Sequence, residues 1–589
     1  MSSKSFVTSA SPSIPSGTRP ADQDPSADAP ASRNTTEVFA VHGADPEVLA
    51  FAMAKYSRSA LSMRESLGEI SAQRAEQFLN TFYFQYGHRS IADLAHIAFA
   101  VERLSLLAAL VLVDEQRWDG QERSTRYQNF QKSGWYFPDF GEDTASATLF
   151  GETIENLHAA YRSTSAAVLQ VLRRRISLPG SMKPEAYERA LKARAFDVAR
   201  YLLPLATNTS LGQIVSARTL ETQVSRLLSH PAAEVRHLGA RLRDAAIGPA
   251  WNVNAAAAQE FVGKLAAWER RATDEGFSPY EELRENLDIV ANEEDQDCSG
   301  LPALAAEAAR LFTRDVRTAP TLVKYAQPNS YQIETRRELT QAAAEILAPL
   351  PVNGLPVAVV DLVERTETLE VEIAATLLYS ASHHSYRQIR DLVAVLPAKR
   401  VNEIVDLGFR HRGRHDEALR AFRAGAALRF DLLMDIGAFR DLHRHRRCTQ
   451  IIQDLTTLHG YETPGSGDLP AGIDILAEAG ILDTYCSAIR AAHAASERIA
   501  ATAGQEPARS EAPQSALYLL PLATRVRGLF KMDFAEAQYI SELRSAPAGH
   551  FSYRRVAWEM FLALQRRHPE LARHIRVTDF TQHIDILQR

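Results

Sequence analysis

The spacing of apolar and polar residues predicts, once in each half of the chain, a strand that leads directly into a helix. In the first half, His96–Glu102 has the pattern of a strand, and Ser105–Val113 that of an apolar helix. In the second half the same succession occurs at Phe430–Ile436 and Ala438–His443. The same local architecture is therefore expected in both halves.

Other segments extend this parallel between the halves. Each half opens on a short apolar strand, Val38–His42 or Val357–Leu362, and a helix of 3.6-residue periodicity follows it. Further helices are predicted at Glu185–Leu203 and Ala535–Leu543. Strands and helices alternate without a regular βαβ rhythm, so we predict an α+β fold and not a doubly wound sheet.

An internal repeat supports a duplication. The string YLLPLAT occurs at Tyr201–Thr207 and again at Tyr518–Thr524, an offset of 317 residues. A weaker match pairs YSRS at Tyr56–Ser59 with YSAS at Tyr379–Ser382, an offset of 323 residues. Chance matching of Ala- and Leu-rich helices is the alternative, but two collinear matches with similar offsets favour two diverged copies of one domain.

The repeat and the composition along the chain predict four segments. Residues 1–35 are rich in Ser, Pro, Ala and Asp and are expected to be a disordered tail. The first copy is expected at 36–275 and the second at 318–589. Between them, 276–317 is expected to be a linker region, and it contains the acidic stretch Asn292–Asp297.

Composition and charge narrow the class of protein. The chain has 589 residues, 46% hydrophobic and 23% charged, the mix of a globular protein. A net charge of −6 argues against a general nucleic-acid binder. No apolar run reaches the about 18 residues of a membrane helix. The cysteines, Cys298, Cys448 and Cys486, are scattered, which fits a reducing cytoplasm.

Two polar clusters are candidates for chemistry. The first is Gln121–Tyr127, and the second, Arg444–Gln450, directly follows an apolar helix. The rigid fork of arginine suits phosphates and planar carbonyl edges. A solvated basic face is the alternative for such a run. His383 and His384 are adjacent and do not face one site on a helix, so no metal site is predicted. No GxGxxG or GxxxxGK motif occurs, so a dinucleotide would not be held on such a turn.

The first copy resembles the flavin-dependent thymidylate synthases over part of their signature. That family carries RHRxxS followed by SxRY, with a GHxS-type element upstream and an ARxxLP segment downstream. The first copy has Gly87-His88-Arg89-Ser90, Ser124-Thr125-Arg126-Tyr127, and Ala199-Arg200 before Leu203-Pro204. At the RHR position, however, it has Asp114-Glu115-Gln116.

The second copy resembles the complementary part of the signature. It has Arg444-His445-Arg446, with Thr449 in place of the signature serine, and Leu543-Arg544 in the later helix. Its SxRY position reads Asp454-Leu455-Thr456-Thr457, and Leu517 replaces the arginine of the ARxxLP segment. What each copy lost, the other kept. The resemblance therefore implies two copies of this family's fold with one composite site shared between them.

The resemblance also implies a reaction, partners and roles. The reaction is methylation of dUMP at C5, with FAD as cofactor, NADPH as reductant and methylenetetrahydrofolate as carbon donor. Arg444 and Ser124 are the implied catalytic residues. The implied nucleotide-binding residues are Glu122, Ser124, Arg126, Tyr127, Arg200, Arg444 and Arg544. The implied flavin-binding residues are Ser90, Glu122, Arg218, Arg444, His445 and Arg446.

The expected partners are a small nucleotide and a folate, without nucleic acid or membrane, in a homodimer that forms a pseudo-tetramer. Three alternatives remain. The protein could bind flavin or nucleotide without catalysis, it could alkylate another uracil nucleotide, or it could be a helical scaffold or RNA-binding protein. Asp441, where the family usually has Gln, stands three residues before Arg444 and raises the question of the nucleotide's identity, because a carboxylate repels a phosphate.

Overall fold

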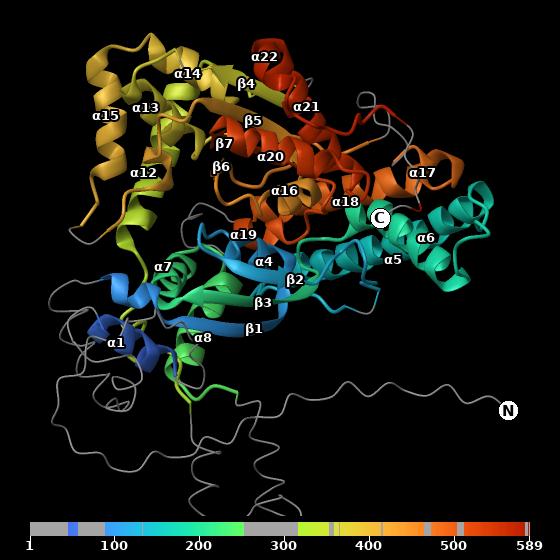
Figure 1. Cartoon of the computed structure of the whole chain (residues 1–589), viewed down its shortest axis with the longest axis horizontal. Helices are drawn as coiled ribbons and strands as arrows, with labels where there is room; N and C mark the ends of the chain where they lie inside the picture. The colour runs from blue at the N-terminus through green and yellow to red at the C-terminus, as the bar shows by residue number, and fades with distance from the viewer. Residues whose placement is uncertain are drawn as a thin grey trace, which may run out of the picture. The chain divides into compact units, whose positions relative to one another are not determined.

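The computed structural model describes most of both copies (Figure 1). The expected tail, the strand at Val38–His42, the segment 57–88 and the acidic linker stretch lie outside the described residues. The described residues are 45–56, 89–131, 133–251, 316–352, 358–364, 366–413, 416–463, 473–502, 512–582 and 587.

The first copy is built on a three-stranded antiparallel sheet with the order β1-β3-β2. These strands are β1 (His96–Ser105), β3 (Asn208–Ser216) and β2 (Asp119–Glu122). Along β1 the residues alternate between buried and exposed, so that Ile97 and Val101 face the core while the opposite face is accessible. The helices packed with these strands are α4 (Leu106–Leu112), α7 (Ala217–Leu228) and α8 (Ala233–Ile247).

The second copy contains a four-stranded antiparallel sheet with the order β4-β5-β7-β6. Its strands are β4 (Val360–Glu364), β5 (Leu428–Asp435), β7 (Arg525–Met532) and β6 (Thr449–Ile452). Every residue of β5 and β7 is buried, because helices cover both faces of the sheet. On one face lie α13 (Leu369–Tyr379) and α14 (Tyr386–Ala394), and on the other α16 (Ile436–Leu442) and α21 (Phe551–Arg567).

The strand-to-helix transitions predicted from sequence are confirmed in both copies. In the first, β1 leads into α4, and the Ser105 hydroxyl accepts a hydrogen bond from the Ala108 N–H. In the second, β5 leads into α16, and the Asp435 carboxylate accepts from the Ala438 N–H at 2.8 Å. Both are N-caps that satisfy a free amide at the start of the helix, and this fixes where strand becomes helix.

The two YLLPLAT repeats pair with each other. Leu205 N–H donates to the Leu520 carbonyl at 3.0 Å, and Leu522 N–H donates to the Leu203 carbonyl at 3.0 Å. The two prolines at the centre of the repeats, Pro204 and Pro521, face each other in an antiparallel bridge. Equivalent residues thus exchange equivalent hydrogen bonds, and the segments are related by an approximate twofold axis.

A single apolar core continues across this junction. It includes buried residues from α5 (Thr144–Arg175) of the first copy and from α18 (Leu482–Ala501) of the second, and these helices pack against each other (Figure 1). The repeats themselves are fully buried within it. Other described elements are α1 (Pro46–Tyr56), η2 (Arg89–Asp93), α6 (Pro184–Ala199), η3 (Arg200–Leu202), α12 (Ser330–Leu347), α15 (Ala398–Phe409), η5 (Arg420–Phe422), α17 (Ile475–Glu478), α19 (Ala512–Leu517), α20 (Phe534–Ser545) and α22 (Pro569–Ala572).

The structure corrects some predicted boundaries. The helix expected at Glu185–Leu203 ends at Ala199 and continues as the short 3₁₀ turn η3, because Leu203 is extended where it pairs with the other repeat. The helix expected at Ala535–Leu543 is confirmed as α20. The opening strand of the second copy, expected from Val357, begins at Val360 as β4, and Val357 lies outside the described residues.

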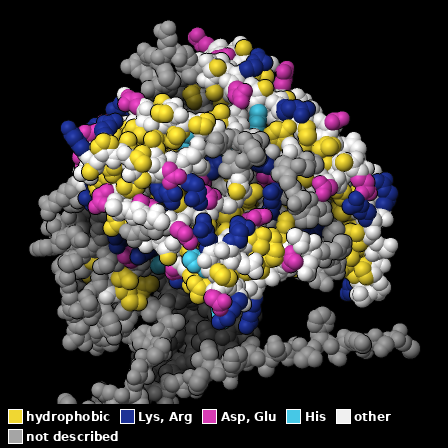
Figure 2. Space-filling view, turned by 90° about the horizontal axis from the view of Figure 1, so that it is seen from above, with side chains coloured by type: hydrophobic (Ala, Val, Ile, Leu, Met, Phe, Trp, Pro, Cys, Tyr) yellow, Lys and Arg dark blue, Asp and Glu magenta, His cyan; other side chains and the backbone are white. Residues whose placement is uncertain are grey.

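No described helix combines the length and the hydropathy needed to cross a membrane. On the face shown in Figure 2, basic and acidic side chains are interspersed with apolar ones.

The paired repeats predict a stability effect at a single leucine. Leu205 is completely buried at the junction, so Leu205→Ala should lower the free energy of unfolding by about 2–5 kcal/mol. Leu571→Ala is the matched control, since Leu571 is 48% exposed on α22, and it should change stability by about 0.5 kcal/mol or less. Urea unfolding followed by circular dichroism measures both, and equal losses would contradict the role given to the junction.

Candidate functional site

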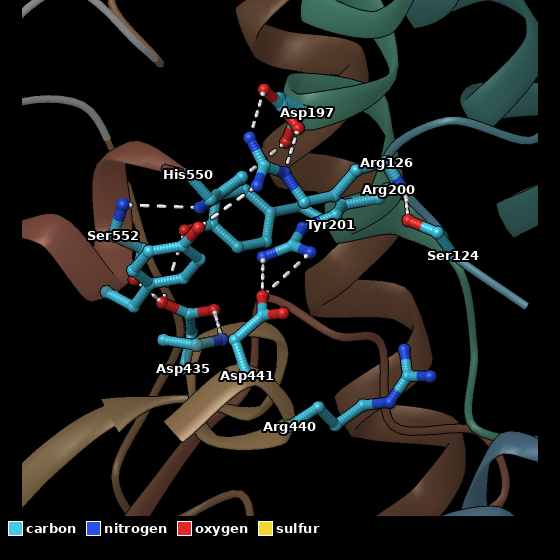
Figure 3. A network of polar contacts seen from close by, with 12 residues as sticks. Ser124, Arg126, Asp197, Arg200, Tyr201, Asp435, Arg440, Asp441, His550 and Ser552 are labelled. Atoms are coloured by element: carbon cyan, nitrogen blue, oxygen red, sulfur yellow. Dashed lines mark hydrogen bonds and ion pairs between the residues drawn. The ribbon is translucent and has the colours of Figure 1, made fainter. Parts of the chain in front are cut away.

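Arg126, in the loop after β2, is buried between the two copies (Figure 3). Its Nε donates to Asp197 Oδ1 at 2.7 Å, and its Nη2 donates to Asp197 Oδ2 at 3.3 Å. Nη1 donates to the Tyr553 hydroxyl at 3.0 Å, and Nη2 also donates to the Ala548 carbonyl at 3.0 Å. Because Tyr553 and Ala548 belong to the second copy, this guanidinium fastens the first copy's SxRY loop to it.

Tyr553, on α21, lies beside arginines from both copies. The guanidinium carbons of Arg126 and Arg544 are 5.8 Å and 5.5 Å from the centre of its ring, within reach of a cation–π interaction. Arg544 Nε donates to His445 Nε2 at 2.7 Å. His445 therefore accepts through Nε2, and burial lowers its pKa, which favours the neutral imidazole required for this contact.

Arg200, at the start of η3, is also buried, with 2% of its surface exposed. Its Nη1 and Nη2 each lie 3.4 Å from Asp441 Oδ2, at the far end of α16, and its Nε is buried without a partner among the described residues. A Cβ at Gly437 would stand 3.3 Å from Arg200 Nη2. Glycine at this position permits the close approach of Arg200 to α16.

Asp435, the N-cap of α16, accepts hydrogen bonds from hydroxyl groups of both copies (Figure 3). The Tyr201 hydroxyl of the first copy donates to its Oδ2 at 3.2 Å, and the Ser552 hydroxyl donates to the same oxygen. The carboxyl is completely buried, and this burial, together with the nearby Glu462, raises the pKa of Asp435 to about 6. A buried acid thus lies where the two copies meet.

Other predicted residues extend the contact between the copies. Glu122 of the first copy forms a partly buried ion pair with Arg440 of the second, and Arg440 Nε has no partner within the described chain. Ser124 Oγ accepts from the Arg126 N–H at 3.2 Å, so it shapes the loop locally. Tyr127 is half exposed, and its ring lies 5.7 Å from the Arg126 guanidinium carbon.

The Arg-His-Arg segment presents two arginines in different environments. Arg444 is exposed, and its side chain makes no hydrogen bond or ion pair with the residues that the structure describes. Arg446 lies over the ring of the buried Trp118 of the first copy, 4.6 Å from guanidinium carbon to ring centre. Its Nε is buried and unpartnered within the described ranges.

A small cavity lies beside Arg446 at the junction. It encloses about 240 Å³ that no atom fills, part of it open to solvent. It is lined by Asp114, Glu115, Gln116, Arg420, His443, Arg446, Cys448 and Gln450. The acidic triplet that replaces RHR in the first copy therefore faces the basic segment of the second.

Ion pairs beside this cavity explain how the acidic side chains of the triplet can be accommodated at the junction. Arg420 Nη1 lies 2.6 Å from Asp114 Oδ1, and Arg226 Nη2 lies 2.8 Å from Glu115 Oε1. Burial acts to raise the pKa of Asp114, but the charges of Arg420, His443 and Arg226 outweigh it and lower that pKa. Burial has the opposite net effect on Glu115 and raises its pKa, in spite of the nearby Arg226. The two acidic residues of the triplet thus bind one arginine from each copy.

Two predicted flavin-side residues are not part of these contacts. Arg218, on α7, forms ion pairs with Asp93 at 3.1 Å and with Glu417 at 3.7 Å. Ser90 lies in η2, and its side chain is outside the described residues. Direct contacts and the shared partner Tyr553 therefore link Ser124, Arg126, Tyr127, Arg544 and His445. Glu122 and Arg200 contact other residues of the second copy, Arg440 and Asp441.

Sequence reasoning missed the residues that hold these arginines. Asp197, three residues before Arg200, could have been found as a lone acid in the apolar stretch at the end of α6. Asp435 and Ser552 gave no such signal, because N-cap carboxylates and hydroxyls are common. Tyr553 and His550 belong to an ordinary amphipathic helix and its cap, and no motif marks them.

A comparison with known families decides the relationship. The family model described as thymidylate synthase complementing protein matches twice, at residues 38–247 and 361–570. The chain belongs to this family. The two matches confirm both the resemblance and the two-copy α+β organisation predicted from the sequence.

Two relatives match this chain over most of their length and over most of its own. A UPF0159 protein of Chlamydia muridarum (strain MoPn / Nigg) is 25% identical over 580 residues, 91% of each chain. A UPF0159 protein of Chlamydia pneumoniae is 25% identical over 574 residues, 93% of this chain and 92% of the relative. Among solved structures, flavin-dependent thymidylate synthase ThyX from Helicobacter pylori complexed with FAD and dUMP matches at 17% identity and a TM-score of 0.23, over 34% of this chain and 89% of that one.

The buried carboxyl group of Asp435 predicts how the free energy of unfolding depends on pH. Below about pH 4, Asp435 is protonated whether the chain is folded or not. As pH rises through about 6, the unfolded chain loses this proton more readily than the folded one, so the stability present at low pH is lost. Between pH 4 and 7 the wild type should therefore lose about 2–3 kcal/mol relative to Asp435→Asn.

Chemical unfolding at a series of pH values measures this difference. Asp406→Asn, at an exposed position of α15, is the control and should follow the wild type at every pH. Parallel curves for the wild type and Asp435→Asn would show that Asp435 ionises normally.

Proposed function

We propose that the chain is an FAD-dependent thymidylate-synthase-type enzyme that methylates dUMP at C5, with methylenetetrahydrofolate as carbon donor and NADPH as reductant. Membership of the thymidylate synthase complementing protein family supports this proposal. The observation that carries it is Tyr553, whose ring is near Arg126 of the SxRY loop and near Arg544, which donates to His445 of the Arg-His-Arg segment. These contacts support a site shared by the two half-signatures.

The proposed phosphate site uses the arginines that have donors to spare. A dianionic phosphate removed from water needs several paired cations. Among the described residues, Arg200 Nε has no partner and its other two guanidinium nitrogens lie 3.4 Å from Asp441. Arg544 donates to His445 through Nε. Each guanidinium nitrogen of Arg126 already donates to a partner, which is Asp197, Tyr553 or the Ala548 carbonyl. We assign Arg200 and Arg544 to the phosphate and regard Arg126 as the residue that positions the loop.

The proposed pyrimidine site combines Arg444 with the loop that carries Ser124. As C5 becomes nucleophilic, negative charge develops on the uracil carbonyl oxygens, and a fixed cation beside them lowers the barrier. Arg444 is the basic residue of its segment whose side chain has no partner within the described part of the chain. Ser124 and Tyr127 belong to the loop fixed by Arg126, so they could orient the base.

The residues near Arg446 fit a polar, anionic cofactor such as FAD. Arg446 Nε is buried without a partner among the described residues, and the neutral His445 stands next to it in the chain. Bound FAD would supply the hydride chemistry, while the protein contributes orientation and charge. His445, Arg446 and Glu122 would hold the flavin, with Arg218 and Ser90 as further flavin-side residues by resemblance.

Two ion pairs favour a second candidate, a flavin- or nucleotide-binding protein without catalysis. Asp441 already faces Arg200, and Asp197 already neutralises Arg126. A bound phosphate would have to compete with both carboxylates. The same observation would suit a uracil nucleotide or derivative other than dUMP.

The proposed assembly is a homodimer that forms a pseudo-tetramer, with copies at 36–275 and 318–589. The exposed Arg444 supports this arrangement, because a second chain could complete the site around it.

Tritium release from dUMP labelled at C5 tests the proposed enzyme. Arg444→Ala should lower the rate by about 10²–10³-fold, because it removes the cation beside the uracil carbonyls. Arg126→Ala should also abolish release, because the loop loses its attachment to the second copy and the buried Asp197 loses its 2.7 Å contact with a guanidinium. Arg447→Ala is the control, since Arg447 is exposed and forms only a surface ion pair with Asp533.

The outcomes separate the two candidates. Full activity of Arg444→Ala would refute the shared site. A wild-type chain that carries flavin absorbance and binds dUMP without tritium release would favour the non-catalytic protein.

Removing the carboxylate at position 441 should strengthen nucleotide binding. Asp441→Asn keeps the shape of the side chain but frees Arg200 and removes a charge that repels the phosphate. The Kd for dUMP should fall about 10-fold, a change of about 1.4 kcal/mol. Calorimetric titration measures it, with uridine, which has no phosphate, as the control ligand. An equal gain for uridine would show that the phosphate is not near Arg200.

A further inference from the structure

One face of the second copy's sheet carries buried charges in alternate positions. On this face β5 presents Arg429 and Asp431, and β7 presents Arg527 and Lys531. Most of their charge is paired locally: Lys531 Nζ lies 2.9 Å from Glu372 Oε1, and Arg527 Nη1 lies 2.9 Å from Asp431 Oδ2. A buried sheet face of this composition is costly unless each polar group finds a partner.

Arg429 has one buried nitrogen, Nη2, without a partner among the described residues, and Arg527 has two. The Arg527 side chain is 1% exposed, and its Nη1 donates to Asp431. Nε and Nη2 are both buried without a hydrogen-bond partner among the described residues. These two nitrogens form the side-on edge of the guanidinium, with parallel N–H groups whose spacing matches the two oxygens of a carboxylate or phosphate.

Other unsatisfied polar groups accompany this edge. His459 is 1% exposed, and both of its ring nitrogens lack a partner within the described residues. The His383 ring lies 5.9 Å from the His459 ring, and its Nδ1 is likewise unpartnered there, as is the neighbouring Ser382 Oγ. Burial lowers the pKa of His459 to about 3, and Arg527 contributes to the same shift. Burial also lowers the pKa of His383. Both shifts favour the neutral imidazole, which has one N–H to donate.

Gln453 connects the segment that contains His383 and His384 to β7. Its N–H donates to the Arg527 carbonyl at 3.1 Å, and its Nε2 donates to the His384 carbonyl at 2.9 Å, while its Oε1 has no partner among the described residues. The unsatisfied groups thus come from three segments held at one place. Native proteins rarely leave even one such group buried without a partner.

We propose that this cluster binds a small oxyanion, with two oxygens on the Nε–Nη2 edge of Arg527 and further hydrogen bonds from His459 and Ser382. A metal cation is disfavoured, because the Arg527 charge repels it and no group of three or more metal-ligating side chains was found in the described chain. The ligand class is a carboxylate or a phosphoryl group. This site is separate from the contacts of Arg126, Arg200 and Arg544, and it goes beyond the proposed function.

Thermal unfolding of the full chain tests the proposal with inorganic phosphate and acetate as separate probes. Each is compared with chloride at the same ionic strength and pH, since a ligand that binds only the folded chain raises Tm. We expect one of them, at tens of millimolar, to raise Tm by about 2 °C or more above chloride. A rise with phosphate alone identifies a phosphoryl ligand, and a rise with acetate alone identifies a carboxylate.

Substitutions test whether the rise in Tm comes from binding at this cluster. Arg527→Gln removes the side-on edge and should abolish the rise. If Arg527→Gln does not fold, Ser382→Ala and His459→Phe take its place and should each reduce the rise by about half or more. Arg544→Gln is the control, because Arg544 belongs to the proposed nucleotide site, and it should retain the full rise.

Three results would overturn the proposal. One is a Tm in phosphate and in acetate no higher than in chloride, which leaves ordered water as the occupant of the cluster. Another is a rise that Arg527→Gln, or both substitute variants, retain in full. The third is a rise that Arg544→Gln abolishes, which would assign the anion to the junction between the copies.

Discussion

The pairing of the two YLLPLAT segments is the constraint on which the rest of the molecule depends. Main-chain hydrogen bonds between residues 201–206 and 518–523 lock the copies in one relative orientation, and the common apolar core keeps these bonds away from water. Each segment is also hydrogen-bonded to the first turn of a helix in its own copy. Leu107 N–H of α4 donates to the Leu205 carbonyl, and Gly437 N–H of α16 donates to the Leu522 carbonyl. The junction therefore sets where the ends of both helices point.

Those helix ends are where the copies have diverged. The residues after α16 are basic, and those after α4 are acidic. Across the junction Arg420 pairs with Asp114 and Arg440 pairs with Glu122, so charges of one copy are balanced by the other. Both pairs are partly buried, so the loss of one partner would leave the other charge in a site that is only partly accessible to water. The two copies thus differ in charge at these helix ends, and basic residues of the second copy contact acidic residues of the first.

The sequence was most informative where local rules decide the structure. The two strand-to-helix transitions followed from apolar periodicity, and the duplication followed from the repeated string. The sequence could not indicate that the repeats pair with each other, because a string says nothing of its partner in space. It also gave no indication of β7, whose buried face carries Arg525, Arg527 and Lys531 in a pattern typical of an exposed strand.

The same distinction holds for the candidate site. The arginines could be named from their motifs, but the carboxylates that hold them could not. Asp197 and Asp441 decide how much of each guanidinium is free, and they are assigned to their arginines only by the fold. A motif gives the identity of a charged group, whereas its availability depends on neighbours that are distant in sequence.

The ion pairs that cross the junction have a consequence for how this chain tolerates substitution. Arg420 and Arg440 of the second copy each contact a carboxylate of the first, so a change in one half alters the surroundings of a residue in the other. Replacing Asp114 with a neutral residue would leave Arg420 without this counter-charge. Residues in such direct contact do not act additively, so substitutions at these positions are expected to be tolerated in pairs.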